Sequence, residues 1–208
     1  MNRLDEIFRE KDGSEAFARG YLDYLSEVLA MVDTKAIARF AEVLLDARER
    51  DAQIFFLGNG GSAATASHFV NDIAIGTRTR SKPFRAVSLT DNLAALTAIA
   101  NDHGYDDVFV RQLEYTLREG DVVVAISVSG NSPNVVAAVE YAIERGARPI
   151  ALTGFDGGRL RELCDVVVHV PTNPGEYGPA EDVHMILDHL VTAYLAQVCA
   201  AEVASQVS

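Results

Sequence analysis

The chain has 208 residues, 49% of them apolar, and its 18 Lys and Arg against 30 Asp and Glu give a formal net charge of -12. This length suits one well-buried domain, so we expect a globular unit over residues 51–208 preceded by a helical extension over residues 1–50. The acidic balance argues against nucleic-acid and membrane-surface partners, because both are anionic.

The cysteines and the hydropathy pattern bear on the compartment. Cys164 and Cys199 are far apart in sequence and form no metal-spaced or redox pair, which fits a reduced compartment, and the cytoplasm is the expected location. The first residues begin a charged stretch without the apolar core of a signal peptide, and no later segment is expected to span a membrane.

A helical pattern runs from about Ser14 to Arg50, and Asp33 or Thr34 is a suitable cap between two segments. These helices have more apolar surface than they need to cover the edge of a sheet. They either pack against another subunit or simply cap the sheet, and the sequence leaves both alternatives open.

Short apolar runs then alternate with helical stretches and predict five strands: Ile54–Leu57, Arg85–Leu89, Val122–Ser127, Pro149–Leu152 and Val166–Val170. Such alternation indicates parallel strands joined by crossover helices, an α/β fold. In the five-stranded order 2-1-3-4-5, strands one and three are neighbours at the topological switch point, where ligands bind. A long terminal helix is expected from about Ala180 to Val203, with Pro179 in its first turn.

Two glycine and serine loops, Gly58–Ser62 and Ser127–Ser132, follow strands one and three and open helical stretches. Glycines such as Gly60 let the backbone approach an anion, and helix N-terminal N–H groups and serine hydroxyls donate hydrogen bonds to it. The first loop meets only an alanine-ending dinucleotide fingerprint without a following acid, and neither loop has the Lys of a nucleotide P-loop. A small phosphorylated metabolite is the expected ligand.

Histidines and carboxylates gather on two helices. His68 and Asp72 are four residues apart on one helical face, where they are either a surface ion pair or part of a site. The terminal helix adds Glu181, His184, Asp188 and His189. His184 is either an imidazole ligand or packs against the sheet or a neighbouring subunit.

These segments resemble the sugar isomerase (SIS) family, specifically its phosphoheptose isomerases. The resemblance covers nearly the whole chain: Gly58–Ser62, His68-Phe69, Leu89–Asp91, Ala100–Asp102, Gly120–Val122, Ile126–Asn134, Leu152–Gly158 and the helix with His184 and His189. It implies a flavodoxin-like parallel sheet flanked by helices and a homotetramer with active sites at subunit contacts. It also implies an isomerase that converts sedoheptulose 7-phosphate to a manno-heptose 7-phosphate through an enediolate.

The resemblance also implies roles for individual residues. The phosphate-binding serines match Ser62, Ser127, Ser129 and Ser132, and the polar residues of the sugar site match Asn59 and Asp91. Gly60, which lies between Asn59 and Ser62 in the first loop, is also expected to bind the substrate. A zinc site matches His68, Asp72, Glu181 and His189, of which Asp72 and His189 are expected to transfer protons.

Two of these positions depart from the better-known members, because Asp72 stands where glutamate is expected and Glu181 where glutamine is expected. Shortening the first side chain withdraws its carboxylate by about 1 Å, a misplacement that can cost about a hundredfold in rate. Two imidazoles and two carboxylates still suit zinc. The alternatives are a non-catalytic SIS protein that binds a partner, such as the replication initiator, or senses a sugar phosphate, and an isomerase of another sugar phosphate.

Overall fold

The structure, a computed structural model, describes residues 2–79 and 82–207. Five parallel strands form one sheet in the order β2-β1-β3-β4-β5. The strands are β1 (Gln53–Gly58), β2 (Arg85–Ser88), β3 (Val122–Ser127), β4 (Arg148–Thr153) and β5 (Val166–His169). Every predicted strand is present within one residue of its expected ends, and the predicted order is confirmed.

Helices cover both faces of this sheet. One face is covered by α3 (Thr34–Glu49), α4 (Gly61–Asn71) and α9 (Tyr177–Val207), and the other by α5 (Leu93–Asp102), α6 (Val110–Thr116), α7 (Pro133–Glu144) and α8 (Gly158–Leu163). A short 3-10 helix, η2 (Tyr105–Asp107), joins α5 to α6. All six residues of β3 are buried, because a central parallel strand has helices above and below it.

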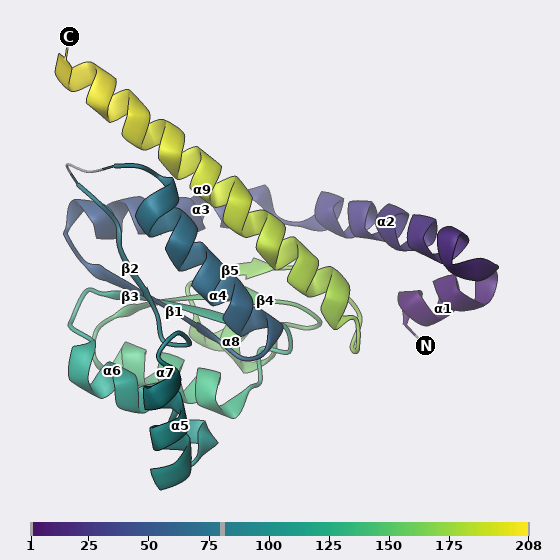
Figure 1. Cartoon of the computed structure of the whole chain (residues 1–208), viewed down its shortest axis with the longest axis horizontal. Helices are drawn as coiled ribbons and strands as arrows, with labels where there is room; N and C mark the ends of the chain where they lie inside the picture. Colours follow the sequence, from purple (N-terminus) through teal and green to yellow (C-terminus); the bar gives the residue numbers. More distant parts are fainter. Residues whose placement is uncertain (1, 80–81, 208) are drawn as a thin grey trace.

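The N-terminal helices are α1 (Arg3–Glu10) and α2 (Gly13–Met31), and Figure 1 shows them extending away from the sheet. The predicted division at Asp33 is confirmed, since its carboxylate accepts a hydrogen bond from the Lys35 amide at 2.8 Å. Helix α1 lies before the predicted helical pattern, which begins at about Ser14. Its signal is a capping box in which Asn2 and Asp5 exchange side-chain-to-backbone hydrogen bonds.

Helix α9 begins at Tyr177, with Pro179 in its first turn as predicted. Contrary to the expectation from the sequence, it is long and apolar enough to span a membrane by length and composition, with a mean hydropathy of 1.3 in its most apolar window. The apolar residues belong to the core, because Val183, Leu187 and Val191 are buried between α9 and the rest of the domain. Helix α9 therefore packs as a core helix and runs alongside α4 (Figure 1).

Candidate functional site

The two glycine and serine loops meet at the carboxyl ends of β1 and β3. These strands are hydrogen-bonded neighbours, with Gly58 in register with Ile126, so the loops that follow them start side by side. Between the loops lies a cavity of about 150 Å³ lined by Asn59, Ser62, Ile126, Ser127, Val128, Ser129, Ser132, Tyr177 and Glu181. The fold thus brings together five of the seven predicted substrate-binding residues at the topological switch point.

The helix ends at this cavity are suited to an anion. Gly60 is the N-cap of α4 with φ +54°, and neither Gly60 nor Ser132, the N-cap of α7, provides a side-chain hydrogen bond to its helix. N–H groups in the first turn of α4 therefore receive no cap from the side chain of the N-cap residue, which leaves them suited to an anion at the helix N-terminus. Ser127 and Ser132 face each other with their hydroxyl oxygens 3.2 Å apart.

Asn59 is held at the mouth of the first loop by two side chains from distant segments. Its amide exchanges two hydrogen bonds with the buried Asn134, at 2.8 and 2.9 Å, and its Oδ1 also accepts from the Tyr105 hydroxyl at 2.9 Å. These bonds fix the orientation of the Asn59 amide. Neither Asn134 nor Tyr105 was identified as a site residue from the sequence, although Asn134 ends the Ser132-Pro133-Asn134 motif.

Two predicted substrate-binding residues do not line the cavity. Gly60 takes part through the helix cap. Asp91 follows β2 and accepts a hydrogen bond from the Ser67 hydroxyl on α4, so it lies beside the helix rather than between the loops. Ser67 is the residue before His68, so its hydrogen bond places Asp91 near the part of the site that contains His68.

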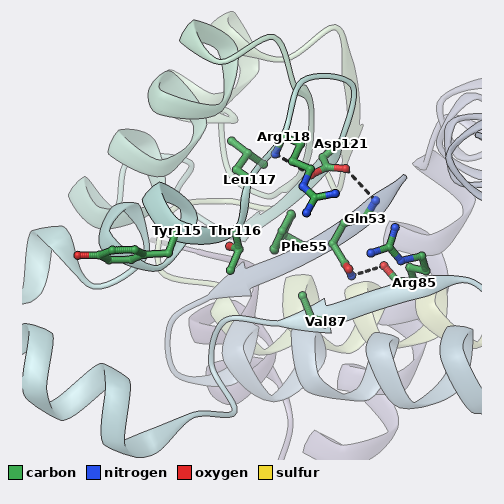
Figure 2. Close-up of a pocket in the computed structure, with 9 residues that line it drawn as sticks. All are labelled: Gln53, Phe55, Arg85, Val87, Tyr115, Thr116, Leu117, Arg118 and Asp121. Carbon is green, nitrogen blue, oxygen red and sulfur yellow. Dashed lines mark hydrogen bonds between the residues drawn. The ribbon is translucent and has the colours of Figure 1, made fainter. Parts of the chain in front are cut away.

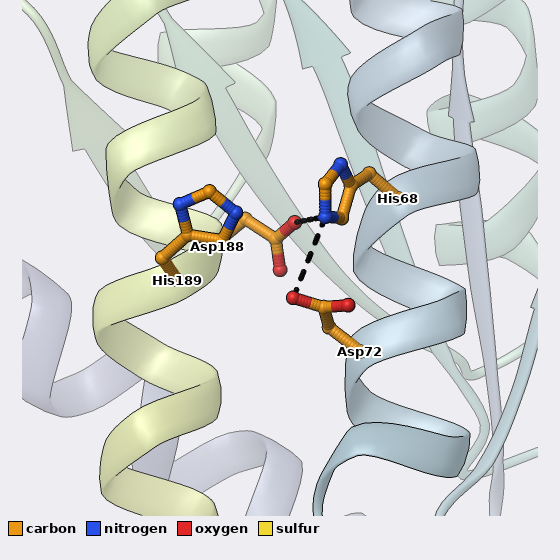
Figure 3. Close-up of side chains that lie close together, drawn as sticks. All are labelled: His68, Asp72, Asp188 and His189. Atoms are coloured by element: carbon orange, nitrogen blue, oxygen red, sulfur yellow. Dashed lines mark ion pairs between the residues drawn. The ribbon is translucent and has the colours of Figure 1, made fainter.

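That second half is a cluster of two imidazoles and two carboxylates, which we call the His/Asp cluster: His68, Asp72, Asp188 and His189. One nitrogen or oxygen atom from each lies within 4.8 Å of the others. His68 Nε2 is 3.5 Å from Asp72 Oδ2 and 3.9 Å from Asp188 Oδ2, and the two imidazole rings are 5.1 Å apart between centroids. Figure 3 shows the four side chains converging between α4 and α9.

Within the cluster, the two acids differ in exposure. The Asp188 side chain is completely buried, whereas that of Asp72 is 21% exposed. Burial raises the pKa of Asp188 to about 6, and the nearby Asp72 carboxylate adds to this rise. The cluster therefore concentrates negative charge where it is poorly solvated, an arrangement that favours a bound cation.

The helix widens where it carries Asp72. Helix α4 continues into a π-helical turn, η1 (Asp72–Gly76), in which the Thr77 amide donates to the Asp72 carbonyl at 3.1 Å. Such turns are rare, and they occur frequently at functional sites. The sequence predicted the pairing of His68 with Asp72 from α-helical spacing and gave no sign of this turn.

Two predicted or considered ligands on α9 lie outside the cluster. Glu181 lines the serine cavity, where burial and the neighbouring Asp182 raise the pKa of its carboxyl. His184 is completely buried with its Nε2 3.3 Å from the Thr153 carbonyl oxygen of β4, and burial lowers its pKa to about 4. Of its two suggested roles, the buried position of His184 fits packing against the sheet, and Asp188 lies in the cluster where Glu181 was expected.

A larger cavity of about 380 Å³ lies elsewhere, at the opposite edge of the sheet (Figure 2). It is lined by the first residues of β1 and β2, Gln53 and Arg85, and by the end of α6 and the following loop, including Asp121. Asp121 there accepts a hydrogen bond from the Gln53 amide at 2.9 Å. None of the predicted site residues lines this larger cavity. Parallel sheets bind their ligands at the carboxyl ends of the strands, whereas this cavity lies at the opposite edge.

Comparisons with known proteins identify relatives of this chain and agree with its fold. The profile of the SIS domain family matches residues 17–154. A phosphoheptose isomerase from Geobacter sulfurreducens is 43% identical over 155 residues, 74% of this chain and 81% of that protein, and one from Aliarcobacter butzleri is 34% identical over 178 residues, 85% and 93% of the two chains. The solved structure of a phosphoheptose isomerase from Neisseria gonorrhoeae superposes with a TM-score of 0.78 at 35% identity, covering 88% of this chain and 98% of that one.

Proposed function

The chain belongs to the SIS domain family, and we propose that it is a phosphoheptose isomerase that converts sedoheptulose 7-phosphate to D-glycero-D-manno-heptose 7-phosphate. One observation carries the proposal: the serine cavity and the His/Asp cluster lie along the same helix. Ser62 and His68 are separated by six residues of α4, about 9 Å at 1.5 Å per residue. A seven-carbon chain with bonds of about 1.5 Å spans roughly 10 Å from its first carbon to its phosphate.

The phosphate end is bound by the serine cavity. Ser62, Ser127, Ser129 and Ser132 offer hydroxyl donors, and the first turn of α4 offers backbone N–H groups. Binding energy gained at the phosphate fixes which carbons face the His/Asp cluster, although the phosphate takes no part in the reaction. The Asn59 amide, held by Tyr105 and Asn134, provides a polar contact for the sugar hydroxyls.

The proton transfers are assigned to Asp72 and His189. Conversion of a ketose to an aldose moves one proton from the hydroxymethyl carbon to the carbonyl carbon, and a second proton between their two oxygens, through an enediolate. Asp72, whose carboxylate is partly exposed beside His68, takes the carbon-bound proton, and His189 on α9 exchanges a proton with the substrate oxygens. Because Asp72 and His189 come from two facing helices, the sugar can lie between them.

One zinc ion per site is part of the proposal, and the donor atoms fit it. Zinc with bonds of about 2.1 Å in tetrahedral geometry holds its ligand atoms roughly 3.4 Å apart. The distances from His68 Nε2 to the two carboxylates are 3.5 and 3.9 Å, and in the described part of the chain no group hydrogen-bonds to the Asp188 Oδ2 atom. His68, Asp72 and His189 would hold the ion, which supplies Lewis-acid polarisation of the substrate oxygens when bound.

The protein is proposed to work in the cytoplasm as a homotetramer with active sites at subunit contacts. A mostly apolar groove of about 330 Å³ runs between α3 and α9, lined in part by Ile37, Leu190 and Tyr194, and the last two are about half exposed. Such a surface suits a second copy of the chain. The two free, buried cysteines suit a reducing compartment.

The test is turnover of sedoheptulose 7-phosphate by the purified protein, measured after chelation and again with added zinc. Asp72→Asn is compared with Asp165→Asn, the same change at an exposed acid away from the site. We expect turnover that only Asp72→Asn abolishes. Binding of the sugar phosphate without turnover in any metal condition would instead support a non-catalytic SIS protein, and turnover of a different sugar phosphate alone would correct the substrate.

A further inference from the structure

The Asp188 carboxylate has no partner that explains its burial. Its side chain is 0% exposed, and its Oδ2 atom has no hydrogen-bond partner among the described residues. Its Oδ1 atom accepts one long hydrogen bond from the Thr192 hydroxyl at 3.4 Å. A buried carboxylate is costly unless it is paired with a cation or fully hydrogen-bonded, so this oxygen requires a further partner.

The unpaired oxygen points into the His/Asp cluster. Its nearest basic neighbour is His68 Nε2 at 3.9 Å, which is too long for a hydrogen bond (Figure 3). Asp72, one turn further along the same helix as His68, lies 3.5 Å from the same imidazole nitrogen. Within residues 2–79 and 82–207, the titratable side chains gathered at this point are two acids and two histidines, and a divalent cation would neutralise both acids.

Glu181 lies at a different place on the same helix. It precedes Asp188 by seven residues, two turns of α9 or about 10 Å along its axis. Its carboxylate lies against the start of α4, since a Cβ atom added at Gly61 would be 2.4 Å from Glu181 Oε2. Glu181 thus faces the serine cavity, whereas Asp188 faces His68, which is seven residues further along α4 than Gly61.

We infer that Asp188, rather than Glu181, supplies the fourth protein ligand of the divalent metal held by His68, Asp72 and His189. The inference rests on the metal dependence in the proposed function. It assigns a ligand role to a residue that the resemblance did not mark. It also leaves Glu181 free to contact the substrate from the wall of the serine cavity.

The experiment measures zinc affinity directly, by competition with a chromophoric chelator, for the wild-type protein, Asp188→Asn and the matched Glu181→Gln. Both variants remove one negative charge from α9 without changing side-chain size. We expect Asp188→Asn to weaken zinc binding by more than about 100-fold, the upper end of the cost of losing an outer-shell contact, and Glu181→Gln by less than about 10-fold. The reverse ranking would overturn the inference while leaving metal binding intact.

A second measurement separates ligation from a structural role. In excess chelator, Asp188→Asn should melt at or above the wild-type temperature, because it removes an unpaired buried charge, and zinc should raise its melting temperature less than it raises that of the wild type. A large fall in the chelated melting temperature with unchanged zinc affinity would make Asp188 merely structural. Asp188→Ser, which leaves room for a water molecule, provides the same comparison if the asparagine variant does not fold.

If the wild-type protein binds no zinc, this inference and the proposed cofactor both fail. The isomerase proposal is decided separately by turnover of sedoheptulose 7-phosphate. The two failures are therefore distinguishable.

Discussion

The loop after β3 is positioned by direct backbone packing against the loop after β4, and Gly130 is the point of contact. Its φ is +64°, and a Cβ atom added there would lie 1.9 Å from the Gly157 carbonyl oxygen. To reach 3.0 Å, the shortest separation that real Cβ atoms show, the contact must open by about 1.1 Å. The Leu160 amide also donates to the Gly130 carbonyl at 3.0 Å, and this bond would stretch with it.

Gly130→Ala should therefore impair both stability and binding. The left-handed backbone costs about 1–2 kcal/mol with a side chain, and loss of the Leu160 hydrogen bond costs about 1 kcal/mol, so we expect a loss of about 2–3 kcal/mol in the free energy of unfolding. Ser129 precedes Gly130, and a shift of about 1 Å in a positioning group can cost about a hundredfold in rate. We expect kcat/KM to fall by about that factor, chiefly through KM.

The control is Gly120→Ala, at the opposite edge of the sheet. Gly120 has φ +84°, and its added Cβ atom would meet only the flexible end of Arg50, at 3.1 Å. This variant carries the backbone strain, about 1–2 kcal/mol, without moving the serine cavity. Urea denaturation gives the stability of both variants, and steady-state kinetics give kcat/KM. If Gly130→Ala retained kcat/KM within about threefold of Gly120→Ala, the close packing of the two loops would not be what positions the serines.

Three further variants test other parts of the site and its support. Asp72→Asn should lower kcat by about 10²–10⁴-fold, the usual contribution of a general base, while a sugar phosphate still protects the variant against thermal unfolding. Tyr105→Phe removes one donor to Asn59, worth about 1 kcal/mol, and should raise KM by about fivefold with little change in melting temperature. Burial alone would raise the pKa of Glu176, but hydrogen bonds from Tyr24 and neighbouring groups outweigh it and hold the pKa below its ordinary 4.5. The charged Glu176 thus stabilises the fold fully above about pH 4.5, and this contribution is lost as the pH falls through the lower folded pKa. Glu176→Gln should melt at a lower temperature than the wild type at pH 7 and lose less on acidification, and parallel melting curves across the acid range would contradict this reasoning.

The sheet could be predicted almost completely from the sequence, because its central strands β1, β3 and β4 are mostly buried on both faces. The residues of β3 before Ser127 are apolar at every position, and the intervening stretches have helical spacing, so few parallel arrangements remain. Helix α1 was missed because its eight residues are mostly polar, and its stability depends on the Asn2 cap and on docking to Glu176. Such tertiary support has no periodic pattern in the sequence.

The candidate site was predictable where chemistry and local spacing coincide. The serines follow neighbouring strands, and His68 and Asp72 share a helical face, so sequence order already places them together. Asp188 was not assigned to the site, because its contact with His68 depends on how α9 crosses α4, a relation between helices more than a hundred residues apart in sequence. An acid directly before His189 was visible in the sequence, but burial alone distinguishes it from a solvated one.

The acid at position 188 gives a physical account of the departure at position 72. The carboxylate of the shorter aspartate side chain reaches less far from α4 than that of glutamate would. With Asp72 alone, the cluster would therefore have one carboxylate oxygen too few near the metal position. Asp188 approaches the same His68 nitrogen from α9, at 3.9 Å against 3.5 Å for Asp72. Each of the two helices therefore contributes one carboxylate near that nitrogen. It follows that the two positions should be coupled: Asp72→Glu should be better tolerated in zinc binding and turnover when Asp188 is replaced by Asn than when Asp188 is retained. A double-mutant cycle measures this coupling, and additive effects within about 0.5 kcal/mol would show that the two acids act independently.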